Sequence, residues 1–212
     1  MKLPFEPPKF REAIESDYYR ASAKAFSWWN IVFEALRSPT FAPVLTMRCC
    51  QSSARIKSPI GKIGFLLSRI LHRWACTRIG VEMPWSVNIG NGFLIVHGWG
   101  AVINGDAVIG RNVTLCHGVT IGGRDTVIDG RRRILLPQID DGVYLGPHAC
   151  VLGCHIGAGS FLAPHALVVH SAKENSLLTP PQADLRSMNF KHIPINSIDD
   201  LQGGALCDAA AP

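Results

Sequence analysis

The sequence contains no long hydrophobic run. No window approaches about 18 uncharged apolar residues, so no transmembrane helix is expected. The first twenty residues, MKLPFEPPKFREAIESDYYR, contain prolines and acidic side chains where an export signal would need an apolar stretch. A cytoplasmic protein is therefore expected, and a position at the inner face of a membrane stays open.

Paired metal-binding cysteines are also lacking. The seven cysteines are an odd number, Cys150 and Cys154 are four positions apart, and Cys49 and Cys50 are adjacent. Neither pair is accompanied by the second pair of cysteine or histidine ligands that a structural zinc site would require. Without an export signal, we expect reduced thiols and no bound metal.

Charge is sparse. Charged residues make up 17% of the chain and apolar residues 47%, which is an ordinary globular composition, and the net charge is +5. This small excess of positive charge is compatible with binding a nucleic acid, a membrane surface or an anionic cofactor, and it does not distinguish among these partners. We expect no nucleic-acid partner.

The residues that are present divide the chain into regions that differ in composition and in the spacing of their apolar residues. Residues 1–80 are rich in helix formers. The run from Lys9 to Ser38 has no internal Gly or Pro and is predicted to end at Pro39, and FAPVLTMRCCQSSARI is expected to continue as a second helix. Residues 81–178 form a second region with a protruding loop at 124–136, and residues 179–212 form a partly flexible C-terminal extension.

Another helix is predicted to begin at Ser58-Pro59, a favourable N-cap and first-turn pair, and to stop at Gly80. Its apolar residues gather on one side, and the rest of its surface is expected to carry Lys62, Arg69, His72, Arg73 and Arg78. The preferred interpretation is that this helix packs against the second region and against neighbouring subunits. The alternative is peripheral contact with a membrane surface.

From Val81 onward, apolar residues recur every six positions. Ile103, Ile109, Leu115 and Ile121 are equally spaced. After the basic insertion RDTVIDGRRRILL the pattern returns, with one step of five between Val151 and Ile156, at Ile139, Leu145, Val151, Ile156, Leu162 and Val168. One short strand per six residues cannot bury its apolar side chain alone, but stacked coils can form a continuous inner ladder. We therefore predict a mainly β fold, a parallel β-helix preceded by an α-helical region.

The segments AVIGRNVTLCHGVTIGG and GVYLGPHACVLG resemble hexapeptide-repeat acyltransferases, and most closely the serine acetyltransferase and polysaccharide O-acetyltransferase group. The likeness covers residues 42–178. It implies a left-handed β-helix and a homotrimer, with pairing of two trimers left open. It also implies acetyl-CoA bound between neighbouring β-helices, with Gly122, Gly123, Arg124, Gly146 and Ala163 at the cofactor.

The segment VHGWG resembles the catalytic histidine motif of that family, which places His97 as general base. Fifteen positions earlier, Glu82 stands where the family has an aspartate that pairs with the histidine. Transfer of acetyl to an alcohol requires removal of the hydroxyl proton, which a neutral imidazole can accept near neutral pH. A carboxylate on the other ring nitrogen would fix the tautomer.

The acceptor is expected to be a saccharide. Leu136 and Val96 stand where serine acetyltransferases carry a histidine and an acidic residue for the amino acid, so the charges of serine would lose their partners. Trp99 could stack on a sugar ring, and His117 could line the acceptor pocket or replace His97 as base. His148, His155, His165 and His170 are expected on turns, away from the chemistry.

Three functions remain open. The first is an acetyl-CoA-dependent O-acetyltransferase of capsule, lipopolysaccharide or exopolysaccharide type. The second is a serine O-acetyltransferase, and the third is a silent β-helical scaffold that only oligomerises.

Overall fold

The computed structural model describes residues 6–181, so residues 182–212 of the predicted C-terminal extension lie outside it. Four helices come first: α1 (Phe10–Ser22), α2 (Trp28–Arg37), α3 (Phe41–Ser53) and α4 (Pro59–Arg78). The uninterrupted helix expected from Lys9 to Ser38 is wrong. The chain breaks at Ala23, whose left-handed φ of 56° lets its N–H close the last turn of α1 on the Tyr19 carbonyl.

The predicted boundaries of α4 are confirmed. The Ser58 hydroxyl accepts a hydrogen bond from the Gly61 N–H at 3.2 Å, and Pro59 occupies the first turn. Gly80 follows the end of the helix with a left-handed φ of 59°. The helix predicted over residues 41–56 is also confirmed as α3.

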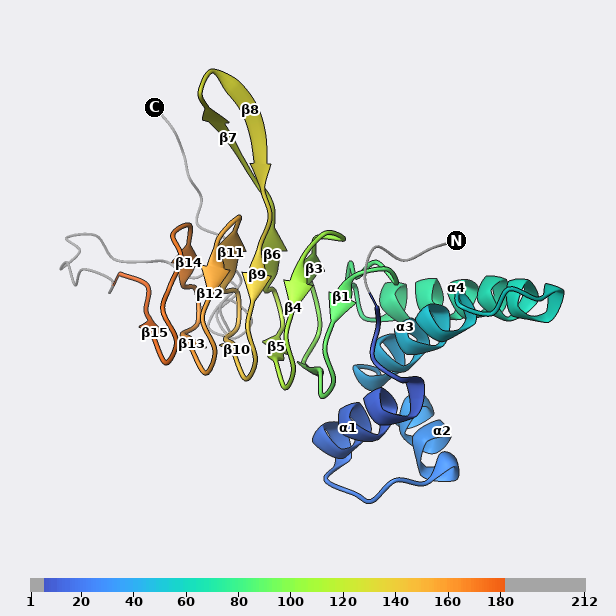
Figure 1. Ribbon diagram of the computed structural model, residues 1–212. Coiled ribbons are helices and arrows are strands. Elements are labelled where there is room, and N and C mark those ends of the chain that lie inside the picture. The colour runs from blue at the N-terminus through green and yellow to red at the C-terminus, as the bar shows by residue number, and fades with distance from the viewer. Residues whose placement is uncertain (1–5, 182–212) are drawn as a thin grey trace, which may run out of the picture. The chain divides into compact units, whose positions relative to one another are not determined.

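After the helices, short parallel strands wind into a β-helix, as the six-residue pattern predicted, and it is left-handed, as the family resemblance implied (Figure 1). We call its three faces sheets A, B and C. Sheet A contains β3 (Val102–Ile103), β6 (Thr120–Gly122), β11 (Cys150–Leu152) and β14 (Leu167–Val168). Sheet B contains β1 (Asn88–Ile89), β4 (Val108–Ile109), β9 (Gln138–Ile139) and β12 (His155–Ile156). Sheet C contains β2 (Leu94–Val96), β5 (Thr114–Cys116), β10 (Tyr144–Leu145), β13 (Phe161–Leu162) and β15 (Leu177–Leu178).

The repeated apolar residues form the inner ladders of this β-helix. In sheet A, for example, Ile103 pairs with Ile121, Ile121 with Val151, and Val151 with Val168. All four are buried. Each strand alternates its side chains between the interior and the surface, so the neighbouring positions face outward. The register therefore decides which side chains can reach a ligand.

An antiparallel hairpin interrupts the coils. It is formed by β7 (Arg124–Ile128) and β8 (Arg131–Leu135) and projects from the stack between sheets A and B (Figure 1). Beyond it the inner ladder resumes, because Ile109 of β4 pairs with Ile139 of β9. The insertion thus adds a surface feature without changing the register of the coils.

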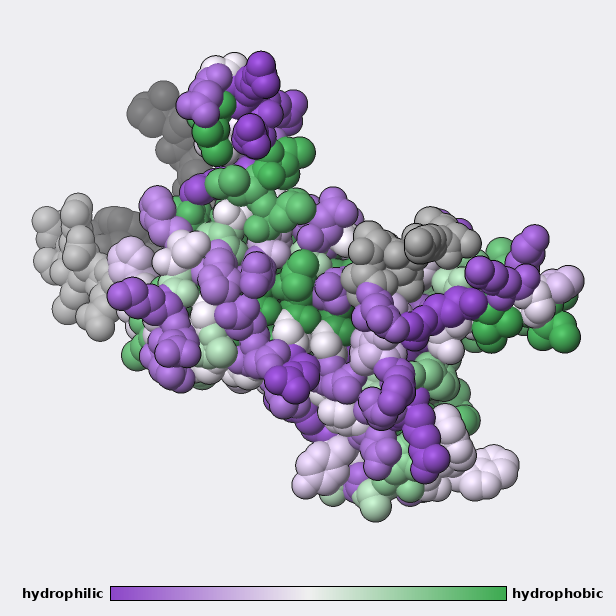
Figure 2. Space-filling model, in the orientation of Figure 1, coloured by the Kyte–Doolittle hydropathy of each residue, from purple (hydrophilic) through white to green (hydrophobic). Residues whose placement is uncertain are grey.

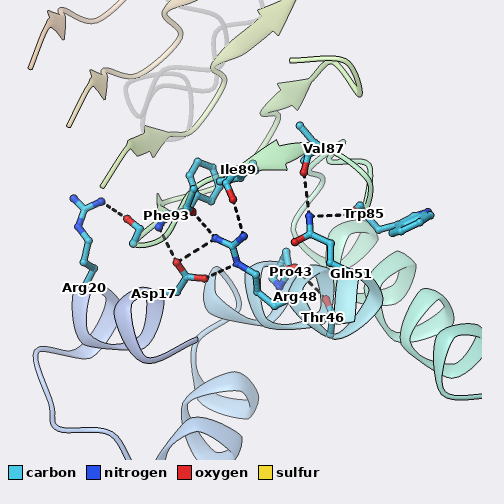
Figure 3. A network of polar contacts seen from close by, with 12 residues as sticks. Asp17, Arg20, Pro43, Thr46, Arg48, Gln51, Trp85, Val87, Ile89 and Phe93 are labelled. Carbon is cyan, nitrogen blue, oxygen red and sulfur yellow. Dashed lines mark hydrogen bonds and ion pairs between the residues drawn. The ribbon is translucent and has the colours of Figure 1, made fainter. Parts of the chain in front are cut away.

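Buried polar side chains join the helices to the first coil (Figure 3). Arg48 of α3 donates to the carbonyl oxygens of Ile89 at 2.8 Å and Gly90 at 2.6 Å, and its guanidinium pairs with Asp17 of α1 at 2.9 Å. The Asp17 carboxylate also accepts from the Phe93 N–H. Burial raises the pKa of Asp17, while Arg48 and this N–H oppose the rise. Asp17 and Arg48 thus satisfy each other at 1% and 2% exposure.

Candidate active site

The candidate site lies at the corner where the chain passes from sheet C to sheet A, which we call the C–A corner. Val96 of β2 and Cys116 of β5 are paired in register, so His97 and His117 directly follow equivalent positions in consecutive coils. Their ring centroids are 6.3 Å apart. The structure therefore brings together the two histidines proposed as general base and runner-up.

The backbone at His97 adopts a tight turn that leaves the imidazole ring exposed. His97 has a left-handed φ of 54°, and its carbonyl accepts from the Trp99 N–H at 2.8 Å. Gly98 is required in this turn, because a Cβ there would lie 2.7 Å from a side-chain carbon of Ile95. His97 and Trp99 are consequently both exposed at the C–A corner, where a ligand can reach them.

His117 has a different environment. Its Nδ1 is buried and has no hydrogen-bond partner within residues 6–181. Buried polar atoms in folded proteins are nearly always paired, so an orphaned imidazole nitrogen indicates a missing partner. A ligand at the C–A corner would be suitably placed to supply one.

His148 and His165 lie on turns, as predicted, but they extend the same row of rings. The His148 centroid is 5.0 Å from that of His117, and His165 stacks on His148 at 5.0 Å. Gly118 makes room for this arrangement, since a Cβ there would lie 2.3 Å from the His148 ring. The expectation that these two side chains lie away from the predicted base region is wrong.

His155 does not lie on a turn. It belongs to β12 of sheet B and pairs with Asp140 at 2.8 Å, which corrects the turn prediction for this residue. The structure gives His170 no comparable partner within the described chain.

Glu82 lies one coil before the predicted base. It pairs in parallel with Val102, which extends sheet A toward α4, and its side chain is exposed. Within residues 6–181, its carboxylate has no hydrogen bond or ion pair, so contact with His97 is not formed in the single chain. Glu82 also lines a groove between α4 and the first coil, together with Arg69, Arg73 and Trp85.

The five residues predicted at the cofactor form two groups. Gly122, Gly123 and Arg124 lie at the corner between sheets A and B, at the base of the hairpin, and Arg124 donates to the Val169 carbonyl at 2.6 Å. Gly146 and Ala163 lie at the C–A corner, where the Gly146 N–H donates to the Leu162 carbonyl. Within one chain, the two groups flank opposite edges of sheet A.

An aromatic pair beside the C–A corner was missed by the sequence analysis. Tyr144 and Phe161 are paired in register on sheet C and stack with their centroids 4.6 Å apart. The Cys116 thiol donates to the Tyr144 hydroxyl at 3.2 Å and raises the pKa of this phenol. Cys116 is itself buried, at 3% exposure.

No group of three or more histidine, cysteine or acidic side chains in the described part of the chain is arranged to hold a metal ion. The row of imidazoles at the C–A corner is spaced by the coils at 5.0 Å or more between ring centroids.

No protein-family model matches the chain. Serine acetyltransferase 4 of Arabidopsis thaliana is 36% identical over 121 residues, which cover 57% of this chain and 33% of that protein. WcaB of Escherichia coli K12, named as a candidate acetyltransferase of colanic acid biosynthesis, is 34% identical over 114 residues, covering 50% and 64%. The chain thus spans less than two thirds of the length of these relatives.

Solved structures agree on the fold. Serine acetyltransferase isoform 3 of Entamoeba histolytica, in complex with cysteine, has a TM-score of 0.60 at 23% identity, covering 86% of this chain and 62% of that one. Serine acetyltransferase of Brucella abortus, in complex with coenzyme A, has a TM-score of 0.58 at 22% identity, covering 82% and 65%. In sequence and in fold, the chain is similar to hexapeptide-repeat acyltransferases of the serine acetyltransferase type.

Proposed function

We propose that the chain is an acetyl-CoA-dependent O-acetyltransferase that acts on a hydroxyl group of a sugar or glycan. The observation that carries the proposal is the C–A corner, where His97 is exposed beside His117 and a buried Nδ1 of His117 lacks a partner among the described residues. The similarity to serine acetyltransferases and to WcaB supports acetyl transfer.

In the proposed reaction, His97 accepts the proton of the acceptor hydroxyl as the oxygen attacks the thioester carbonyl. A C–O bond forms, the C–S bond breaks, and the coenzyme A thiolate takes the proton from the His97 imidazolium. Glu82 is exposed on the preceding coil, and we assign it to orient the imidazole once its side chain turns toward the C–A corner. His117 would hydrogen-bond the acceptor or the developing oxyanion.

Acetyl-CoA would bind between subunits of a homotrimer. A ligand between two copies could contact the hairpin base of one subunit and the C–A corner of its neighbour. Such an arrangement would unite Gly122, Gly123 and Arg124 with Gly146 and Ala163, which a single chain keeps at opposite edges of sheet A.

The preference for a saccharide rests on apolar residues and an exposed aromatic. Val96 is half-buried directly before His97, and Leu136 is 47% exposed at the base of the hairpin. Neither can pair with the ammonium or carboxylate of serine, whereas Trp99, at 64% exposure, offers a face to a sugar ring. Serine O-acetylation is the second candidate, favoured by the names of the relatives that match.

The test is coenzyme A release from acetyl-CoA, with L-serine or a panel of sugars and oligosaccharides as acceptors. We expect saccharide-dependent release that falls at least about a hundredfold in His97→Ala, the usual scale of general-base catalysis. His155→Ala is the matched control, because His155 is bound to Asp140 on another face. Serine-dependent release would establish the second candidate, and release that never exceeds background hydrolysis would reject both.

A further inference from the structure

Helix α4 packs on the rest of the chain through its small and polar side chains. Its buried residues are Gly61, Ser68, His72, Ala75 and Cys76. His72 anchors this face, with hydrogen-bond contacts to the Met83 carbonyl at 2.8 Å and the Thr46 hydroxyl at 3.1 Å. The predicted packing of α4 against the second region is confirmed by the contact of His72 with Met83, and the face that makes it lacks the large apolar residues. Packing against neighbouring subunits stays a prediction.

The apolar side of α4 points away from the chain. We call it the α4 stripe; it comprises Ile60, Ile63, Leu66, Leu67, Ile70, Leu71 and Trp74, each between 55% and 81% exposed. Figure 2 shows hydrophobic residues along one side of the free end of α4 and hydrophilic residues along another. A continuous exposed patch of this kind marks an interaction surface, unlike scattered single apolar residues.

Cations border the α4 stripe. At about 100° per residue, Lys62, Arg69 and Arg73 fall in one row along its edge. None of the three forms an ion pair with another residue of the described region. At the end of the helix, the Arg78 guanidinium lies over the Trp74 ring at 5.5 Å. The segment from Pro59 to Arg78 contains no Asp or Glu.

This charge pattern decides between two occupants. A second copy of α4 packed antiparallel would bring the two rows of cations together, and a copy packed parallel would leave each row unpaired, because neither helix contains an acidic residue. The surface of an anionic bilayer satisfies both features, because acyl chains accept the stripe while lipid phosphates meet the bordering cations. No helix within residues 6–181 is long and apolar enough to cross a membrane.

We infer that α4 is an anchor that lies on the surface of an anionic phospholipid bilayer. The α4 stripe enters the boundary between headgroups and acyl chains, and Lys62, Arg69 and Arg73 bind phosphate groups at its edge. The buried face of α4 stays on the protein, so binding requires no unfolding. This inference does not depend on the proposed acetyltransferase activity.

The test is flotation of the full chain with vesicles of equimolar phosphatidylglycerol and phosphatidylcholine, compared with vesicles of phosphatidylcholine alone. We expect binding to the anionic vesicles that weakens as salt is raised. The variant Ile63→Ser/Leu67→Ser/Ile70→Ser and the variant Arg69→Glu/Arg73→Glu should each lower the partition coefficient by about tenfold or more.

Matched controls come from the hairpin. Val127→Ser/Ile128→Ser/Ile134→Ser and Arg131→Glu/Arg133→Glu make the same chemical changes at other exposed positions and should leave binding unchanged. Circular dichroism verifies that every variant is folded. The inference is overturned if the wild-type chain does not float, or if stripe and hairpin variants bind equally well. It is also overturned if the stripe variant dissociates the oligomer without affecting flotation, since the stripe would then be an interface between copies.

Discussion

At the scale of single residues, Glu82 and His97 lie on successive coils without touching in one chain. If Glu82 orients the imidazole, Glu82→Gln should lower kcat by about tenfold or more and leave the KM for acetyl-CoA nearly unchanged. Glu82→Asp should recover part of the rate, because it keeps the carboxylate. Steady-state kinetics across pH measures both. Identical pH profiles for wild type and Glu82→Gln would remove Glu82 from the mechanism.

The buried and half-buried thiols allow a second test at this scale. Burial raises the pKa of Cys50 to about 12 and that of Cys76 to about 11, and it also raises the pKa values of Cys49, Cys150 and Cys154. Because the thiolate is the reactive form, these five should react slowly with a thiol reagent near pH 8 in the native protein. All seven cysteines should react at once in denaturant. Rapid reaction of Cys50 or Cys76 in the native state would show that the helices open readily.

Sequence reasoning found part of the row of histidines. His97 is predictable because VHGWG resembles the catalytic motif of the family, and His117 lies within the six-residue count that runs from Ile103 to Ile121. The hairpin breaks that count before His148 and His165, so only the resumed pairing of β5 with β10 reveals that they are neighbours of His117. The unpaired Nδ1 of His117 depends on three-dimensional packing and has no sequence signal.

At the scale of elements, the pair of Arg48 and Asp17 joins α3, α1 and the first coil. Arg48→Met should lower the free energy of unfolding by about 3–5 kcal/mol, because it leaves a buried carboxylate and two carbonyl groups without their partner. Denaturant unfolding measures the loss. Arg111→Met is the control, since Arg111 and Asp141 form an exposed pair at 2.7 Å, and its effect should be far smaller. Equal effects would mean that burial does not set the strength of these pairs.

The hairpin is expected to be dispensable for folding. Replacing residues 126–133 with Asn-Gly keeps the pair of Asp125 and Ile134 and closes it with a favourable two-residue turn. The melting temperature should change little, because Ile109 and Ile139 maintain the inner ladder without the hairpin tip. Thermal unfolding provides the measurement. A large loss of stability would show that the tip packs on a neighbouring subunit.

Elements differ in how far sequence predicts them. The boundaries of α4 follow from Ser58, Pro59 and Gly80, whose local preferences need no tertiary partner. The break at Ala23 has no such signal, because alanine is ordinarily a strong helix former. The choice of the buried face of α4 likewise has no local sequence signal. The buried face is set by close packing of small residues and the hydrogen bonds of His72, which outweigh the simple preference for burying Ile and Leu.

At the scale of the whole molecule, the proposed acetyl-CoA site requires more than one chain. We predict a native mass three times that of the 23.1 kDa chain, or six times if two trimers pair. Light scattering coupled to size exclusion measures it directly. A monomer at all concentrations would contradict the intersubunit site, because the two proposed cofactor groups would stay on opposite edges of sheet A.

The hydrogen bonds that attach α1 and α3 to the first coil have a consequence for solubility. In a parallel β-helix, the main-chain N–H and C=O groups of each coil pair with those of the next coil. The first coil has no preceding coil, so without the helices its unpaired groups could bind a strand of another molecule. Arg48 covers the carbonyls of Ile89 and Gly90, and Gln51 covers those of Trp85 and Val87. We therefore expect the helices to act as a plug that prevents end-to-end polymerisation of the β-helix. A fragment starting at Val81 would lose that plug and should assemble into fibres through its first coil.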